Sequence, residues 1–287
     1  MKAIYKKEVK SYLTSMIGYV FIFFILLLEG IYFTAYNLQN AYPLFGTTLS
    51  AVTFIFLILV PVLTMKTIAE ERKQKTDQLL LTAPVSVSEI VLGKFLAVAT
   101  VYVIPVLIIC LYPMIMGKYG TVSYAMAYTA VLGFALLGFA QIAVGVFWSS
   151  VTENPVIAAV VTFIVLFVCY MITGIGSLIP DSSMASLACY MLLVLLAAVW
   201  IYHMIRNLWI AAVIGIAGEA ALAITYVVKS TLFEGSIQKF LTVFDITSHF
   251  DNFTNGILDL QGVVYFLSVI IIFLVLTVQT ITKRRWN

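Results

Sequence analysis

Long uncharged apolar runs alternate with short polar segments along the chain. A membrane-spanning helix needs about 20 mostly apolar residues, because the hydrocarbon core is roughly 30 Å thick and a helix rises about 1.5 Å per residue. Eight runs are candidate spans, at about 17–37, 49–65, 95–116, 122–148, 155–177, 185–202, 208–228 and 261–282. The pattern predicts an all-α integral membrane protein with about eight transmembrane helices. The short connection between 185–202 and 208–228 favours a helical hairpin.

Composition excludes a water-soluble protein. Of the 287 residues, 63% are apolar and only 10% are charged, whereas soluble domains are near half apolar and about a quarter charged. So few charges cannot cover a solvent-exposed surface, and so apolar a chain is not disordered. A net charge of +3 gives no support to a nucleic-acid partner. We conclude that the chain lies in a lipid bilayer.

The basic residues predict the orientation in the membrane. Loops that face the cytoplasm carry an excess of Lys and Arg close to the ends of the spans. With the N-terminus inside, only Lys118, Lys229 and Lys239 lie outside, and the other 13 of the 16 basic residues are cytoplasmic. We therefore expect a multi-pass protein of the plasma (inner) membrane, with both termini in the cytoplasm.

Residues 1–14 predict an amphipathic helix that lies in the membrane interface. Ile4, Val9 and Tyr12 recur at helical spacing, and lysines such as Lys6 occupy the other face. This arrangement suits an apolar side in the headgroup region and ammonium groups toward anionic lipid. The apolar run that follows has no small-residue cleavage site, so we do not expect a cleaved signal peptide.

Residues 66–94 form the one substantial cytoplasmic segment and hold nine of the 29 charged residues. The pattern predicts a helix over 68–82 that ends before Pro84, because the residue preceding a proline avoids helical geometry. Ser86 or Ser88 would cap a second helix that runs into the third span. Between the two helices lies an apolar knob formed by Leu79, Leu80, Leu81, Pro84 and Val85. Leucines exposed among charges are typical of a docking surface; the alternative is a loop that packs on the ends of its own spans.

Residues 229–260 form the longest loop on the outside. One apolar helical face is formed by Phe233, Ile237, Phe240, Leu241 and Phe244. Asp245, Asp251 and Asp259 interrupt the second half of the loop. The segment is too polar to span the membrane and too apolar to float in water. We expect it to lie in the outer interface or to re-enter the membrane under cover of neighbouring helices.

No enzyme signature is present in the sequence. A Walker A loop needs a further glycine five residues before the Gly-Lys pair and a Ser or Thr after it. Gly93-Lys94-Phe95 and Gly117-Lys118-Tyr119 lack both. The three cysteines are isolated inside apolar spans, which argues against disulfides and against a metal site. We expect a non-catalytic chain that binds no cofactor or metal itself.

Three polar side chains lie at membrane depth in the predicted spans. Glu29 and Glu219 are functional candidates, because an ionisable group in the membrane is costly unless it faces protein or water. The alternative for each is a protonated or hydrogen-bonded carboxyl that joins two helices. Gln141 is a milder case and favours a helix–helix contact.

The combined pattern resembles the ABC-2 class of transporter permeases. The most specific stretch runs from Glu70 to Ser86 and continues to Lys94; the family pattern is E-x-R-x-x-G-T, an acidic residue, leucines, a proline, a serine and L-G-K. In this chain Lys75 stands where glycine is usual, and Asp77 where glutamate is usual. The resemblance covers about 1–178 and 230–287, while the pair 185–228 departs from the usual six spans.

The resemblance implies a single permease domain over the whole chain and a coupling element that docks on a separate ATP-binding subunit. The docking residues would be Glu70, Glu71, Arg72, Asp77, Leu79, Leu80, Leu81 and Pro84. Two permease chains, identical or different, and two ATPase chains would form the transporter, and ATP and Mg would bind to the ATPase. An outer gate would include Phe240, Phe244, Asp245, Phe250 and Asp251. The family works mostly in export.

The C-terminal stretch from Phe244 to Tyr265, with the final Lys283-Arg284-Arg285-Trp286, looks like the gliding-motility-type branch of these permeases. That branch implies an auxiliary extracytoplasmic partner and keeps open a subunit that uses ATP for mechanical work or anchoring. A proton-coupled secondary transporter that uses Glu219 or Glu29 is the other alternative. The substrate is not indicated by the sequence.

Overall fold

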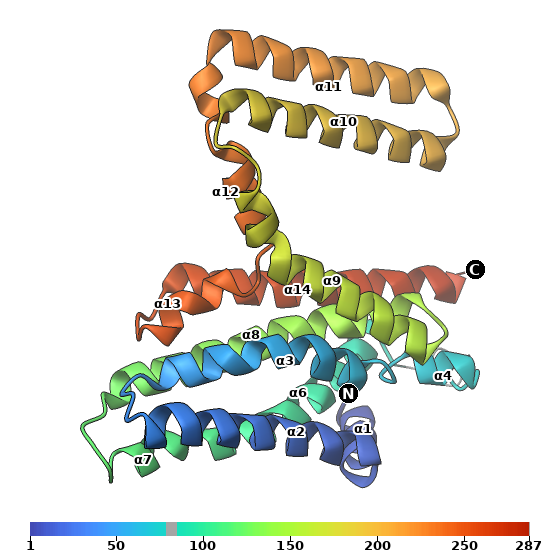
Figure 1. The fold of residues 1–287 in the computed structure, drawn as a ribbon. Helices are drawn as coiled ribbons and strands as arrows, with labels where there is room; N and C mark the ends of the chain where they lie inside the picture. The colour runs from blue at the N-terminus through green and yellow to red at the C-terminus, as the bar shows by residue number, and fades with distance from the viewer. Residues whose placement is uncertain (79–84, 287) are drawn as a thin grey trace. The chain divides into compact units, whose positions relative to one another are not determined.

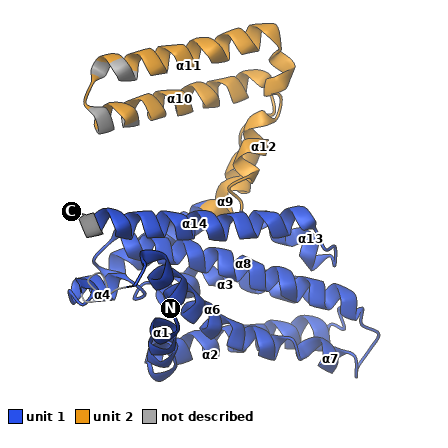
Figure 2. Cartoon of the chain, turned by 180° about the vertical axis from the view of Figure 1, so that it is seen from behind, with its two compact units in different colours: residues 1–168, 246–287 blue, residues 169–245 orange. Residues whose placement is uncertain are grey.

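The structure is a computed structural model that describes residues 1–78 and 85–286, and all regular structure in these residues is helical. Seven of the described helices are long and apolar enough to cross a membrane. An eighth span results if a pair bent by 116°, Ala212–Val228 with Ser230–Thr242, counts as one. The predicted all-α membrane protein with about eight spans is therefore confirmed. The chain divides into two compact units, residues 1–168 with 246–287 and residues 169–245 (Figure 2).

Unit 1 contains the N-terminal helices and the last span. Its helices are α1 (Lys2–Thr14), α2 (Met16–Tyr32) with its π-helical extension η1 (Phe33–Gln39), α3 (Phe45–Thr64), α4 (Ala69–Lys73), α6 (Val87–Ile109), α7 (Tyr112–Met116), α8 (Tyr124–Val151), η3 (Ser248–Phe250), α13 (Asp251–Thr254) and α14 (Leu260–Trp286). Helix α9 (Pro155–Ser177) begins in unit 1 and ends in unit 2. Figure 1 shows α3 and α8 side by side.

Helix α8 is the centre of unit 1 and packs against α3, α6 and α14. Its Phe134 is fully buried, with its ring centroid 4.8 Å from that of Phe56 on α3 and 6.3 Å from that of Tyr102 on α6. The Tyr102 hydroxyl donates a 2.7 Å hydrogen bond to the Phe134 carbonyl. Gly138 lets the Tyr102 ring approach the α8 backbone, since a Cβ there would lie 2.3 Å from the ring. Aromatic packing of this kind holds three spans together.

Unit 2 is built around a helical hairpin. Its elements are α10 (Ser183–Ile205), α11 (Leu208–Val228), η2 (Ser230–Phe233) and α12 (Ser236–Thr242). Arg206, in the left-handed conformation at φ 54°, ends α10 and turns the chain into α11. The two helices pack against each other along their length. They approach closely at Gly218, where a Cβ would lie 2.8 Å from Val194 Cγ1.

Two local predictions are wrong. The predicted helix over 68–82 is interrupted after α4 by a turn at 74–76, where Lys75 takes a left-handed φ of 57°. The predicted single helical face over 233–244 is also divided, because Gly235 at φ 62° separates η2 from α12. Left-handed backbone ends a right-handed helix, and the hydrophobic period alone does not reveal it. The predicted serine cap is confirmed at Ser86, whose Oγ accepts a 3.3 Å hydrogen bond from the Glu89 N–H.

Candidate functional site

A buried ion-pair cluster joins three helices at the end of unit 1 where α1 lies. Lys94 of α6 is 1% exposed, and its Nζ lies 2.8 Å from Glu71 Oε2 of α4 and 3.0 Å from Glu8 Oε1 of α1. Nζ also donates a 2.7 Å hydrogen bond to the Thr67 carbonyl. Lys7 of α1 reaches the other oxygen of Glu71 at 3.0 Å. We call Lys7, Glu8, Glu71 and Lys94 the Lys94 cluster.

The residues of the Lys94 cluster line a polar cavity of about 600 Å³ that also includes Tyr12, Lys66 and Glu70. The Tyr12 hydroxyl donates a 3.2 Å hydrogen bond to the Leu63 carbonyl and lies 3.0 Å from the Thr67 hydroxyl. Burial raises the pKa of Tyr12 above its ordinary value. Partial burial alone would lower the pKa of Lys7, but the hydrogen bond and charge of Glu71, together with Glu8, raise it. Both effects favour the protonated state, in which Lys7 holds α1 to α4 and Tyr12 holds α1 to Leu63 of α3 and to Thr67.

The turn that leads from α3 into α4 is fixed by one side chain of α8. Ser149 Oγ accepts hydrogen bonds from the Ile68 N–H at 3.0 Å and the Ala69 N–H at 3.1 Å, and donates to the Met65 carbonyl at 3.0 Å. Ser149 is fully buried. A serine therefore satisfies the first backbone donors of α4 from outside that helix, as an N-cap would from within. Helix α4 is thus held to α1, α6 and α8 at once.

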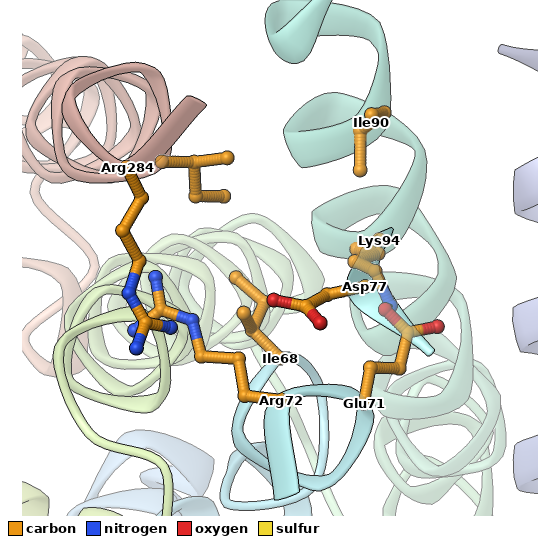
Figure 3. A pocket seen from close by; sticks show the side chains of 8 residues that line it. Ile68, Glu71, Arg72, Asp77, Ile90, Lys94 and Arg284 are labelled. Carbon is orange, nitrogen blue, oxygen red and sulfur yellow. The ribbon is translucent and has the colours of Figure 1, made fainter. Parts of the chain in front are cut away.

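A second, smaller cavity of about 30 Å³ lies between α4, α6 and α14 (Figure 3). Figure 3 shows the guanidinium groups of Arg72 and Arg284 side by side, with the Asp77 carboxylate near them. Arg72 is buried. Arg284 forms an ion pair with Glu153, which follows α8. The last turn of α14 therefore meets the α4 region at the same end of unit 1.

The predicted docking residues have different surroundings in the structure. Glu70 is half-buried and accepts a 2.7 Å hydrogen bond from the Gln74 amide. The Glu71 carboxylate belongs to the Lys94 cluster, and Arg72 lines the smaller cavity. Asp77 is half-buried. The predicted residues Leu79, Leu80, Leu81 and Pro84 lie outside the described residues.

The three polar candidates of the spans are divided between the units. Glu29 of α2 is fully buried, and neither carboxylate oxygen has a hydrogen-bond partner in the described part of the chain. Gln141 of α8 is also buried, and its Oε1 likewise lacks such a partner. Glu219 lies in unit 2 on α11, with both oxygens buried and without a partner among the described residues. The structure does not bring these three residues together within one unit.

The predicted outer-gate residues also belong to both units. Phe240 and Phe244 are exposed in unit 2, with ring centroids 5.3 Å apart. Asp245 is buried in the same unit and accepts a 2.9 Å hydrogen bond from the Thr173 hydroxyl. In unit 1, Phe250 is fully buried against Phe134 of α8. Asp251 begins α13.

The Lys94 cluster was not predicted as a site, although the sequence carried a partial signal. Glu8 is the one acidic residue of an otherwise basic amphipathic helix. Lys94 lies inside a predicted helix, well past its cap, where a buried lysine requires an acidic partner. The pairing joins residues 86 positions apart, so the partner became identifiable only in the folded chain.

A family model described as ABC-2 family transporter protein matches residues 28–278. The match includes α4, Lys94 and Ser149, and it also includes the α10–α11 hairpin. None of the curated proteins matches the chain.

Proposed function

The chain belongs to the ABC-2 family of transporter proteins, and from this premise we propose that it couples a membrane pathway to ATP-binding subunits through the segment 70–86. Family membership and seven to eight spans make the chain a multi-pass membrane protein of the permease type. The sequence carries no nucleotide-binding loop. We propose that ATP and Mg are bound by the separate subunits, two per transporter.

The observation that carries the proposal is the attachment of α4 to three other helices. The ion pairs of Glu71 tie α4 to α1 and to α6, and Ser149 ties the start of α4 to α8. A displacement of the 70–86 segment by a docked subunit would therefore move α4 together with these helices. An ATP-dependent change needs such a link, because a ligand shifts a conformational equilibrium only where its contacts differ between the two states.

The transporter we propose is a dimer of permease chains, each with an ATP-binding subunit, in the plasma membrane with both termini in the cytoplasm. The excess of basic residues near one set of span ends supports this orientation. Export is the direction we propose, on the resemblance to the family pattern around Glu70 to Ser86. The C-terminal resemblance to the gliding-motility-type branch supports mechanical work or anchoring on an extracytoplasmic partner as a variant of the same function.

Co-purification with an ATP-binding subunit tests the proposal. The full chain is co-expressed with an ATP-binding subunit of the ABC type from the same genome, and the complex is isolated through a tag on the permease. The combination Glu70→Lys with Leu80→Asp should remove the ATPase, while Glu234→Lys, an exposed charge of unit 2, should retain it. Glu71 is left unchanged because its replacement would also break the Lys94 cluster. Equal recovery of the ATPase with both variants would refute docking through 70–86.

Proton-coupled transport is a second candidate, favoured by the carboxyls of Glu29 and Glu219, which have no hydrogen-bond partner among the described residues. In vesicles that contain this chain and no ATPase, a pH gradient should then drive uptake of the transported substrate. Glu219→Gln should abolish this uptake. The ATP-coupled proposal expects no such uptake in either protein.

A further inference from the structure

A long groove runs between α10 and α11 of unit 2, with a volume of about 610 Å³. One face of each helix lines it: Leu195, Ala198 and Tyr202 on α10, and Gly215, Glu219 and Ala223 on α11. These residues recur at three- and four-residue spacing, so each set lies on a single helical face. Glu219 is the one carboxylate among the lining residues.

Close approach of the two helices forms the floor of the groove. A Cβ at Gly215 would lie 3.2 Å from the Ala198 Cβ, and one at Gly218 would lie 2.8 Å from Val194 Cγ1. Small residues at these positions allow the backbones to approach, as in other membrane helix pairs. The hollow therefore lies along a packed seam and does not separate the helices.

The Glu219 carboxylate lies in this apolar setting, and no ion pair with a described residue neutralises it. Both of its oxygens are buried, and neither has a hydrogen-bond partner in the described part of the chain. Glu219 stands near the middle of α11 (Leu208–Val228), a helix of membrane length. An ionised carboxylate at such a depth costs several kcal/mol unless a cation or a donor reaches it. A positive charge held in the groove would supply that partner after a rotation of the flexible glutamate side chain.

The dimensions of the groove favour a small ligand over a further helix. Its volume falls within the range of about 300–1,000 Å³ typical of small-molecule sites, which are mostly apolar with few polar groups. Large apolar side chains are exposed around the hairpin and also outside the groove, for example Leu192, Leu196 and Ile224. Apolar exposure therefore marks no single face for a partner helix, and lipid suffices to cover it. The groove differs from the other exposed apolar surfaces of the hairpin in its volume and in the Glu219 carboxylate that lines it.

We propose that this groove binds a lipophilic cation, a quaternary onium ion or protonated amine with large apolar substituents. The apolar groups lie along the two helical faces, and the positive centre pairs with Glu219. This binding requires no ATP-binding subunit, so it is independent of the docking proposed for segment 70–86.

Equilibrium dialysis with two probes of matched size and opposite charge tests the site. The full-length protein in lipid nanodiscs is titrated with tetraphenylphosphonium and with tetraphenylborate, and empty nanodiscs are subtracted. We expect saturable binding of the cation with one site per chain, and at least tenfold weaker binding of the anion. Glu219→Gln should lower the affinity for the cation at least tenfold, and Glu219→Asp should retain the preference for the cation. Glu234→Gln, which removes an exposed carboxylate from the same unit, should change nothing.

A second variant tests the groove without touching its charge. Ala220, which also lines the groove, is replaced by phenylalanine to fill the hollow, and we expect saturable binding of the cation to be lost. Saturable binding that survives this replacement, or equal affinity of the wild type and Glu219→Gln, overturns the proposal. A cysteine introduced at the groove by Ala212→Cys tests whether a second copy of the chain occupies it. Disulfides between copies that the cation does not inhibit would show a second copy in the groove, and this result also overturns the proposal.

Discussion

The Lys94 ammonium lies 2.8 Å from the Glu71 carboxylate and joins α6 to α4 at a position that is 1% exposed. Glu8 adds a third helix to this contact, since its Oε1 lies 3.0 Å from the same ammonium. A buried charge is tolerated only when opposite charges and hydrogen bonds surround it. The Lys94 cluster is therefore a point where three helices depend on one side chain.

Lys94→Met should lower the free energy of unfolding by about 3–5 kcal/mol, the usual effect of removing one partner from a buried ion pair. Among the described residues, Glu8 and Glu71 would then keep only the exposed Lys7 as a shared cation. Thermal and denaturant unfolding in detergent, followed by tryptophan fluorescence, measures the change. Replacing Glu8 and Glu71 by leucine in the same variant should restore much of the loss. A single Lys94→Met variant as stable as the wild type would contradict the structural role of the cluster.

Ser149→Ala should lower the free energy of unfolding by about 1–3 kcal/mol, because two buried N–H groups at the start of α4 lose their acceptor. Ser150 is the matched control. It is equally buried, but its Oγ has no hydrogen-bond partner in the described part of the chain. Ser150→Ala should leave stability unchanged or raise it slightly. The same unfolding assay compares the two alanine variants, and an equal effect of both would refute the anchoring of α4 by Ser149.

Lys75→Gly should stabilise the protein by about 1 kcal/mol, since Lys75 holds a φ of 57° that only glycine adopts without strain. Its neighbour Gln74 has a right-handed φ of −85°. Gln74→Gly should therefore destabilise the protein by up to about 1 kcal/mol through the greater freedom of the unfolded chain. Opposite shifts of the unfolding midpoint confirm the turn, and shifts of the same sign would argue against it.

Alkaline pH should weaken the attachment of α1 to α4, through Lys7, and to α3, through Tyr12. The pKa of Lys7 is raised above 10.5 despite partial burial, mainly by the hydrogen bond and charge of Glu71, and burial raises the pKa of Tyr12 above 10.0. Both groups are favoured in their protonated form, so their contribution to stability is fully present below about pH 10 and is lost as the pH rises beyond it. Between pH 9 and about pH 12, the free energy of unfolding should fall less steeply for Lys7→Met and for Tyr12→Phe than for the wild type. Lys10→Met, which removes an exposed lysine of the same helix, should follow the wild-type curve.

The spans and the capped start of α6 could be predicted from the sequence. Apolar runs of membrane length become helices because backbone groups in lipid must bond within their own segment. Ser86 precedes Glu89 at the spacing of a helix cap, which is a local signal. The left-handed turn at Lys75 could not be predicted from the hydrophobic pattern, because it depends on backbone geometry at a residue that rarely adopts it. The family pattern, with a glycine at this position, is the sequence feature that agrees with it.

The candidate site was predictable only in part. Glu70, Glu71 and Arg72 were grouped by their place in one charged segment. In the folded chain Glu70 lines the polar cavity, Arg72 lines the smaller cavity near α14, and Glu71 lines both. Which of these side chains meets Lys94 is decided by packing between α1, α4 and α6, which are far apart in sequence. Glu29 and Glu219 were identified by their depth in the spans, and Glu219 lines the groove between α10 and α11.

ATP hydrolysis by the reconstituted complex tests most directly whether the Lys94 cluster carries coupling. Wild-type, Lys94→Met and Glu8→Gln permeases are each purified with the ATP-binding subunit, checked for equal amounts of bound ATPase, and assayed in proteoliposomes. We predict that both variants retain the bound ATPase, because the segment 70–86 is unchanged. Both should lose most of the stimulation of ATP hydrolysis that the wild-type permease gives. Full stimulation in folded complexes of both variants would contradict the account.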